Sequence, residues 1–198
     1  YSTAIQNDGK IIVAGSSGNS FALARYNSNG SLDTSFDGDG KTTVNFGTNE
    51  DYGQSVVIQN DGKIIIAGIT TSIGLNTDFA LARFNTNGTL DNTFGVGGKV
   101  ITSVGGEDQA YQVALQSDGK IIVVGTSSLG SDYGYSLARY NSEGTLDTSF
   151  DGDGKTILDL AFDINRDSFT IALQTDGKIV IGGVSDGDFA VLRLNSNG

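Results

Sequence analysis

The residues best suited to chemistry in this chain are carboxylates, and some of them recur in a fixed loop. The segment 33–40, Asp-Thr-Ser-Phe-Asp-Gly-Asp-Gly, returns unchanged at 147–154, whereas the copy at 91–98 has lost two of its three acids. Alternating aspartate and glycine can present oxygens from a tight turn, as calcium loops do. The resulting calcium candidates are Asp33, Asp37, Asp39, Asp147, Asp151 and Asp153. Plain turn formation explains the same Asp-Gly pairs, and that alternative stays open.

A second group of acids lies in two shorter polar connections. Its members are Glu50, Asp51, Glu107 and Asp108. On a rigid scaffold such loop residues are typical of a binding face. Two carboxylates can also flank and hydrolyse a glycosidic bond, so a carboxylate-based, glycan-active enzyme is an alternative hypothesis.

Composition removes most other chemistry. The 198 residues include no His, Cys, Met, Trp or Pro. This excludes a Ser–His–Asp triad, a cysteine nucleophile, disulfides and zinc held by His or Cys. We therefore expect no cofactor other than calcium. The net charge of −11 disfavours nucleic acid as a partner. No long apolar run and no signal-peptide pattern is present, so we expect no membrane insertion.

The elements that carry these residues are set by an internal repeat. The tripeptide Asp-Gly-Lys recurs at 8–10, 61–63, 118–120 and 176–178. An aromatic residue precedes an arginine by four positions at 21–25, 79–83, 135–139 and 189–193. The pattern Gly-x-Leu-Asp-x-x-Phe follows three of these segments, at 30–36, 88–94 and 144–150.

Each unit is predicted to contain four strands, here called a to d. For the second unit they are 41–46, 54–59, 63–67 and 79–85. Strand c is continuously apolar and should be buried on both faces. Strand d alternates large and small residues, and the Asp-Gly between b and c is a strong hairpin signal. No stretch has a helical period, so helix should be nearly absent.

Four-stranded antiparallel units at intervals of 53 to 58 residues predict an all-β β-propeller, with a β-solenoid as the alternative. We expect one propeller region over 1–198. Its blades would be approximately 1–27, which lacks strand a, then 41–85, 99–141 and 155–195. The missing strand has two explanations. The chain is a window on a larger array, which we favour, or a neighbouring chain supplies the strand.

The motifs also resemble a known family. The order Gln-x-Asp-Gly-Lys-Ile-Ile-x-x-Gly, then aromatic-Ala-Leu-Ala-Arg-aromatic-Asn, then Gly-x-Leu-Asp-x-x-Phe is similar to the delta-60 repeat, over essentially the whole chain. The resemblance implies a bacterial β-propeller within a long secreted or cell-surface protein. It implies no particular activity, because the family has none in general.

Most cations occupy fixed repeat positions, which indicates a structural role. The arginines of strand d are Arg25, Arg83, Arg139 and Arg193. We predict that each pairs with an acid in the following loop: Arg25 with Asp33, Arg83 with Asp91, and Arg139 with Asp147. The phenylalanines at 36, 94 and 150 should plug these loops into the core.

The function is predicted from the connections between strands that differ from unit to unit. The a–b and c–d connections share one rim of the blades, and the c–d connections differ in length from unit to unit. We therefore expect a non-catalytic, extracellular scaffold or binding platform, whose partner at the cell surface is a protein or a glycan. Besides the enzyme, the alternative is a structural spacer, secretion cargo or polymer subunit completed by strand exchange.

Overall fold

The computed structural model describes residues 1–47, 50–71, 76–130, 132–159, 170–185 and 188–198. Within these ranges the chain forms strands and turns and no helix, as the repeat predicts. No helix long and apolar enough to cross a membrane occurs in this part of the chain. The strands are β1 (Ser2–Ile5), β2 (Ile11–Ser16), β3 (Phe21–Tyr26), β4 (Lys41–Val44), β5 (Asp51–Ile58), β6 (Ile64–Thr71), β7 (Thr77–Phe84), β8 (Lys99–Thr102), β9 (Asp108–Leu115), β10 (Ile121–Leu129), β11 (Asp132–Tyr140), β12 (Lys155–Leu158), β13 (Thr170–Leu173), β14 (Ile179–Ser185) and β15 (Asp188–Leu194).

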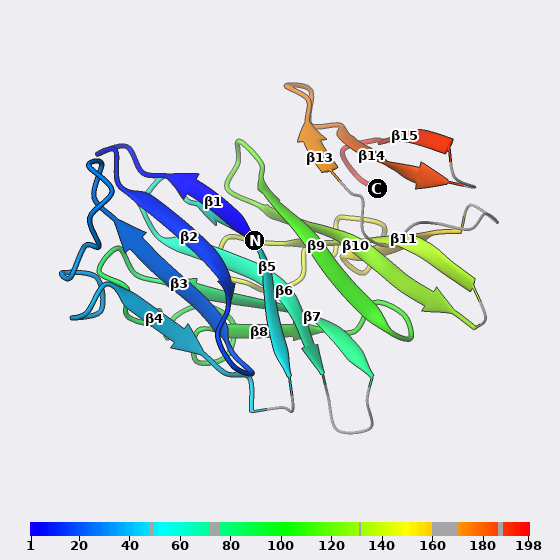
Figure 1. Ribbon diagram of the computed structural model, residues 1–198. Coiled ribbons are helices and arrows are strands. Elements are labelled where there is room, and N and C mark those ends of the chain that lie inside the picture. The colour runs from blue at the N-terminus through cyan, green and yellow to red at the C-terminus, as the bar shows by residue number, and fades with distance from the viewer. Residues whose placement is uncertain (48–49, 72–75, 131, 160–169, 186–187) are drawn as a thin grey trace.

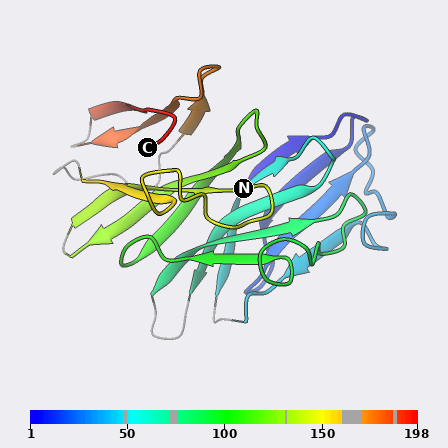
Figure 2. The ribbon, with the colours of Figure 1, turned by 180° about the vertical axis from the view of Figure 1, so that it is seen from behind.

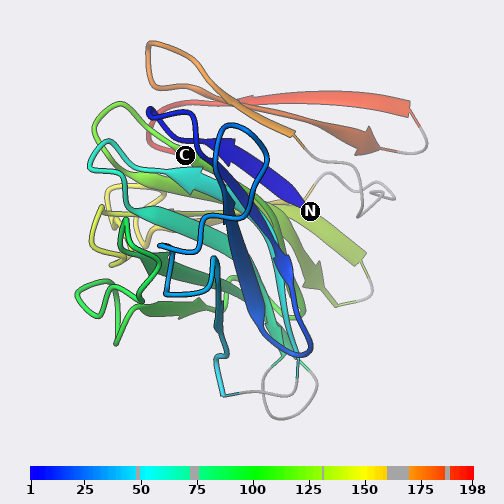
Figure 3. The same cartoon turned by 60° about the vertical axis from the view of Figure 1, so that its left-hand side comes forward.

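These strands form four antiparallel sheets that follow one another in chain order (Figure 1). The first three sheets are β1-β2-β3-β4, β5-β6-β7-β8 and β9-β10-β11-β12. The last sheet, β13-β14-β15, has three strands among the described residues. It lies at one end of the row of sheets (Figure 2) and runs along the top of the view in Figure 3.

The grouping of strands into blades differs from the prediction. Strand 41–44 was expected to open the second blade, but it pairs with β3 of the first, with Phe21 opposite Val44. Before it, Leu32 forms a bridge with Tyr26, so the long connection turns back beside β3 and delivers β4 to the same sheet. The first blade therefore has all four strands, and the last blade is the one with three strands among the described residues. We call the sheets blades 1 to 4 in chain order.

The hydrophobic core consists of three clusters, one between each pair of neighbouring blades. Phe21 and Leu23 of β3 pack with Ile64 and Ile66 of β6 in the first cluster. The next clusters join blade 2 to blade 3 and blade 3 to blade 4 in the same way. Burial of these apolar faces is the main force holding the row of blades together.

Strand c is buried on both faces only where a blade has neighbours on both sides. In β6 and β10 the first seven residues are buried, whereas β2 alternates between buried and half-buried positions. In blade 3 the c–d hairpin remains paired as far as Leu129 opposite Asp132, so much of the predicted connection 125–134 is strand.

The predicted Asp-Gly hairpins form at the b–c turns. In blade 2 the Gly62 amide donates to the Gln59 carbonyl at 2.8 Å, and Gly62 has a φ of +83°. This left-handed conformation favours glycine. The Asp61 carboxylate then accepts from the Lys63 amide at 3.1 Å. Each b–c turn therefore fixes a lysine at the start of strand c.

Candidate functional site

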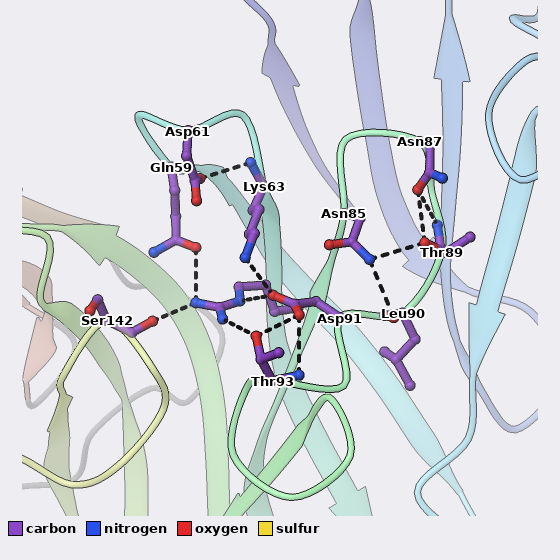
Figure 4. A network of polar contacts seen from close by, with 11 residues as sticks. Gln59, Asp61, Lys63, Asn85, Asn87, Thr89, Leu90, Asp91, Thr93 and Ser142 are labelled. Atoms are coloured by element: carbon purple, nitrogen blue, oxygen red, sulfur yellow. Dashed lines mark hydrogen bonds and ion pairs between the residues drawn. The ribbon is translucent and has the colours of Figure 1, made fainter.

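Arg83 of blade 2 is buried within a network of polar contacts. Figure 4 shows its partners Gln59, Asp91, Thr93 and Ser142 around the unlabelled guanidinium group. Its Nε donates to Asp91 Oδ2 at 2.7 Å, and its Nη2 donates to Thr93 Oγ1 at 3.3 Å. The guanidinium carbon lies 4.7 Å from the centre of the Phe94 ring. The flat cation is thus held by a carboxylate at its edge and an aromatic ring at its face.

The predicted ion pairs form in all three complete blades. The Nε–Oδ2 distance is 2.7 Å for Arg25 with Asp33 and for Arg139 with Asp147, as it is in blade 2. The phenylalanines at 36, 94 and 150 are fully buried, and each has an arginine over its ring. Arg193 holds the same place in β15 but is exposed, and no ion pair involves it within the described ranges.

The sequence did not reveal that the three buried arginines also join each blade to the next one. Arg83 Nη1 donates to the Ser142 carbonyl of blade 3 at 2.6 Å, and Arg25 Nη1 donates to the Thr86 carbonyl of blade 2 at 2.6 Å. Arg139 makes the same contact with the Ser196 carbonyl of blade 4. A second bond runs beside each, for example from the Asp37 amide to the Asn87 carbonyl at 2.7 Å. We call this set of contacts the inter-blade clasp.

In blades 1 to 3 the lysine of the Asp-Gly-Lys turn completes the clasp, whereas Lys178 of blade 4 pairs with Asp176 of its own turn. Lys63 Nζ lies 2.9 Å from Asp91 Oδ2, and Lys10 and Lys120 make equivalent contacts. Burial pushes the pKa of Asp91 upward, but the hydrogen bonds from Thr93 and Lys63 outweigh it and hold the pKa well below its ordinary value. The lysine that follows each Asp-Gly is visible in the sequence, but its contact with the loop aspartate was not predicted from it.

The calcium candidates do not form one ligand set in the structure. Asp33 and Asp147 are buried in the clasps. The carboxylates of Asp39 and Asp153 face their own turns, where each accepts from the amide two residues later at 2.9 Å. Asp37 and Asp151 are exposed, with φ of 49° and 46°. Among the described residues, no group of three acidic side chains is placed to hold a metal ion.

Two of the four predicted binding-face acids are buried, which corrects the prediction. Asp51 and Asp108 are 0% exposed. Asp108 accepts from the amides of Val104 and Gly105 at 2.7 and 2.9 Å, and Asp51 accepts from the Phe46 amide at 2.8 Å. These carboxylates close the a–b bends from within, because buried backbone amides need acceptors. They are therefore not available to a ligand at the surface.

The other two acids, Glu50 and Glu107, are exposed and each accepts a tyrosine hydroxyl. Tyr52 donates to Glu50 and Tyr133 donates to Glu107, both at 2.8 Å. The bond to Glu50 raises the pKa of the Tyr52 phenol. Tyr52 and the two glutamates lie at or beside the a–b connections, and Tyr133 begins strand d, so all four occupy the rim predicted to bind. We call these four residues the tyrosine–glutamate rim.

A cavity lies on the opposite rim, where the b–c turns emerge. It has a volume of about 940 Å³ and is lined by residues of blades 2, 3 and 4. A smaller cavity of about 200 Å³ adjoins it between blades 2 and 3 and shares Asn60, Leu115 and Gln116 with it. Because these turns are nearly constant in length, the sequence did not predict a binding site on this face.

Comparison with one solved structure supports the fold. A protein of unknown function from Dyadobacter fermentans matches with a TM-score of 0.59 at 10% sequence identity, over 100% of this chain and 64% of its own. A virginiamycin B lyase from Staphylococcus aureus matches with a TM-score of 0.39 at 12% identity, over 98% of this chain and 69% of its own. The chain therefore spans less than two thirds of the Dyadobacter protein.

Comparison at the level of sequence gives a family but no relative of established function. No curated protein matches the chain. One family model matches residues 6–36, 59–94, 116–150 and 174–198, which is more than half of the chain and places one match in each blade. The chain therefore belongs to the β-propeller family described as a domain of unknown function, DUF5122.

Proposed function

We propose that this chain is a non-catalytic binding platform, in which the repeated residues build a rigid frame and the tyrosine–glutamate rim contacts a protein or glycan. The observation that carries the proposal is the pairing of the exposed Tyr52 with Glu50 and of the half-buried Tyr133 with the exposed Glu107. A phenol ring offers apolar area and a carboxylate offers acceptors, which together suit sugar hydroxyls or polar protein groups.

The setting of this rim completes the proposal. Within the DUF5122 family, the motifs favour the delta-60 type of repeat, and we infer that the parent protein is bacterial and is secreted or displayed at the cell surface. The net charge of −11 favours partners other than nucleic acid. With Asp51 and Asp108 bound to backbone amides, fewer acids remain for proton transfer, which favours binding over catalysis.

The test is a screen of the chain against immobilised glycans and outer-surface protein extracts, with reducing-sugar release measured in parallel. Tyr52→Ser and Tyr133→Ser should each weaken binding about fivefold. Glu107→Gln should weaken it as well, whereas Glu143→Gln, an exposed glutamate on the opposite rim, should leave it unchanged. Equal binding by all variants would contradict the proposal. Sugar release abolished by Glu107→Gln would favour the enzyme alternative instead.

Assembly is a second candidate function, favoured by the outer face of blade 4. Phe189 and Val191 of β15 are 81% and 58% exposed, whereas their counterparts in β7, Phe79 and Leu81, are fully buried by blade 3. The opposite end of the row has a hollow of about 380 Å³ over the small residues Ala22 and Ala24. The large side chains at one end and the hollow over small residues at the other end are the two kinds of surface that meet between neighbouring blades.

We propose that the 198-residue chain associates head to tail through these two faces, as heterologous contacts do. Light scattering should detect concentration-dependent oligomers that Phe189→Asp abolishes, while Val96→Asp, a change at another exposed apolar residue, leaves them intact. A monomer at every concentration would contradict this second candidate.

A further inference from the structure

Two exposed asparagines are each followed by glycine in the turn that leaves strand d. The pairs are 29–30 in blade 1 and 87–88 in blade 2. Asparagine in this context is prone to deamidation, because glycine has no side chain to shield its backbone nitrogen from the neighbouring carboxamide. Blade 3 has Glu143 at this position, and the pair 197–198 includes the last residue of the sequence. The first two pairs are therefore the matched ones.

The two turns have the same local hydrogen bonds. The Ser31 amide and hydroxyl donate to Asn29 Oδ1 at 3.0 and 2.7 Å. The Thr89 amide and hydroxyl donate to Asn87 Oδ1 at 3.2 and 2.8 Å (Figure 4). Donors to this oxygen make the carboxamide carbon more electrophilic. In both turns the glycine amide also donates to the carbonyl three residues earlier, at 2.9 Å in blade 1 and 3.0 Å in blade 2, so the turn must open before that nitrogen can react.

The two turns differ in their contacts with another blade. The inter-blade clasp holds the turn of blade 2, where the Asn87 carbonyl accepts from the Asp37 amide at 2.7 Å and the Thr86 carbonyl accepts from Arg25 Nη1 at 2.6 Å. Within the described ranges no bond from another blade reaches residues 28–29, their counterparts in blade 1. Opening the turn of blade 2 therefore breaks two additional hydrogen bonds.

The surroundings of the two glycines differ in the same direction. A side-chain carbon placed on the exposed Gly30 would have no atom within 4 Å beyond its chain neighbours. On the buried Gly88 it would lie 2.9 Å from the Asp37 amide nitrogen and 3.0 Å from the Phe36 ring. Blade 1 thus covers the reacting part of the second turn, whereas that of the first turn is open to water.

We propose that the inter-blade clasp protects Asn87 from deamidation and that Asn29 is the faster site in this chain. The Gly30 nitrogen gives its proton to solvent base and bonds to Asn29 Cγ. The Cγ–Nδ2 bond breaks, and ammonia leaves with a proton taken from water, which yields a cyclic succinimide. Water then adds to either ring carbonyl and opens the ring to aspartate or isoaspartate. The net reaction consumes water, releases ammonia and adds a negative charge to the turn.

The test incubates the folded chain at mildly alkaline pH and measures the change from amide to acid in tryptic peptides by mass spectrometry. Cleavage after lysine and arginine gives the peptides 26–41 and 84–99, and fragment ions locate the converted residue. Dilute, monomeric protein is used, so that the result does not depend on head-to-tail association. Asn29 should convert about tenfold faster than Asn87. Equal rates, or faster conversion of Asn87, would overturn the proposal.

The same chain in urea provides the control for local sequence. The two asparagines lie in the matched tetrapeptides Ser-Asn-Gly-Ser and Thr-Asn-Gly-Thr, so their rates should agree to within about twofold once the blades are unfolded. A tenfold difference that persisted in urea would assign the effect to the sequence and would overturn the role of the clasp.

Three variants test the protection and the site. Arg25→Lys removes the arginine that reaches the blade 2 turn and should speed conversion of Asn87 about fivefold. Arg139→Lys makes the same change in the clasp between blades 3 and 4 and should leave that rate unchanged. Asn29→Glu introduces the residue type of blade 3 and should abolish conversion in the peptide 26–41. An unchanged rate at Asn87 in Arg25→Lys, an equal rise in both arginine variants, or conversion that persists in Asn29→Glu would contradict the proposal.

Discussion

Arg83 and Asp91 are eight residues apart in the chain and form an ion pair of 2.7 Å, while the same guanidinium donates to the Ser142 carbonyl of the next blade. One side chain therefore closes its own loop and joins two blades. Because the arrangement recurs at Arg25 and Arg139, the blade-to-blade geometry is set by the repeat itself. Residues outside the clasp and the core are then free to vary with function.

The clasp predicts an acid-sensitive fold. The folded-state pKa values of Asp33, Asp91 and Asp147 are lowered from the ordinary 3.8, so their ionised forms stabilise the folded chain. That stability is fully present above roughly pH 5 and is lost as the pH falls through 3.8 and below. Urea midpoints measured from pH 6 to pH 2 should fall, and Asp91→Asn should flatten the fall. An unchanged pH profile in this variant would contradict the role of the clasp.

Asp78 should act in the opposite direction. Burial raises the pKa of this half-buried carboxyl, against a hydrogen bond from Ser103, and nearby Asp108 raises it further. Its protonated form is therefore favoured in the folded state, and its stabilising effect is lost as the pH rises through the folded-state pKa. Asp78→Asn should be more stable than the parent chain at pH 8, but not at pH 3. A stability gain of the same size at both values would show that Asp78 does not titrate in this way.

The buried a–b acids predict a contrast between neighbours in the chain. Asp108→Ala leaves the amides of Val104 and Gly105 without their acceptor and should lower stability by about 2 kcal/mol. Glu107→Ala removes an exposed carboxylate and should change stability by less than about 0.5 kcal/mol. Denaturant unfolding of the two variants measures both values. Equal effects on stability would contradict the role of Asp108 as a buried acceptor for these amides.

The loop acids predict the response to calcium. Because Asp33 and Asp147 are held by cations and Asp39 and Asp153 by their own turns, we expect neither calcium nor a chelator to shift the melting temperature. Differential scanning calorimetry with each additive checks this. A rise with calcium that Asp37→Asn and Asp151→Asn remove would assign a metal site to these loops.

Local patterns in the sequence predicted the strands and the arginine pairs. The alternation at 21–25 fixes which face of β3 is buried, and the eight-residue spacing between Arg25 and Asp33 is set within one loop. The blade grouping was missed because strand 41–44 has the same local pattern whether it pairs with β3 or with β5. Asp108 was misplaced because its burial depends on a bend that brings the Val104 amide over its carboxylate, which its spacing from Glu107 does not reveal.

The most direct test of the central claim, that the repeated arginines hold neighbouring blades together, is the melting temperature of Arg83→Lys. Lysine keeps the charge but lacks the planar fork that contacts Asp91, Thr93 and Ser142 at once. We predict a loss of about 2 kcal/mol, or roughly 6 °C, while Arg193→Lys at the same repeat position melts like the parent chain. An unchanged melting temperature for Arg83→Lys would contradict the claim.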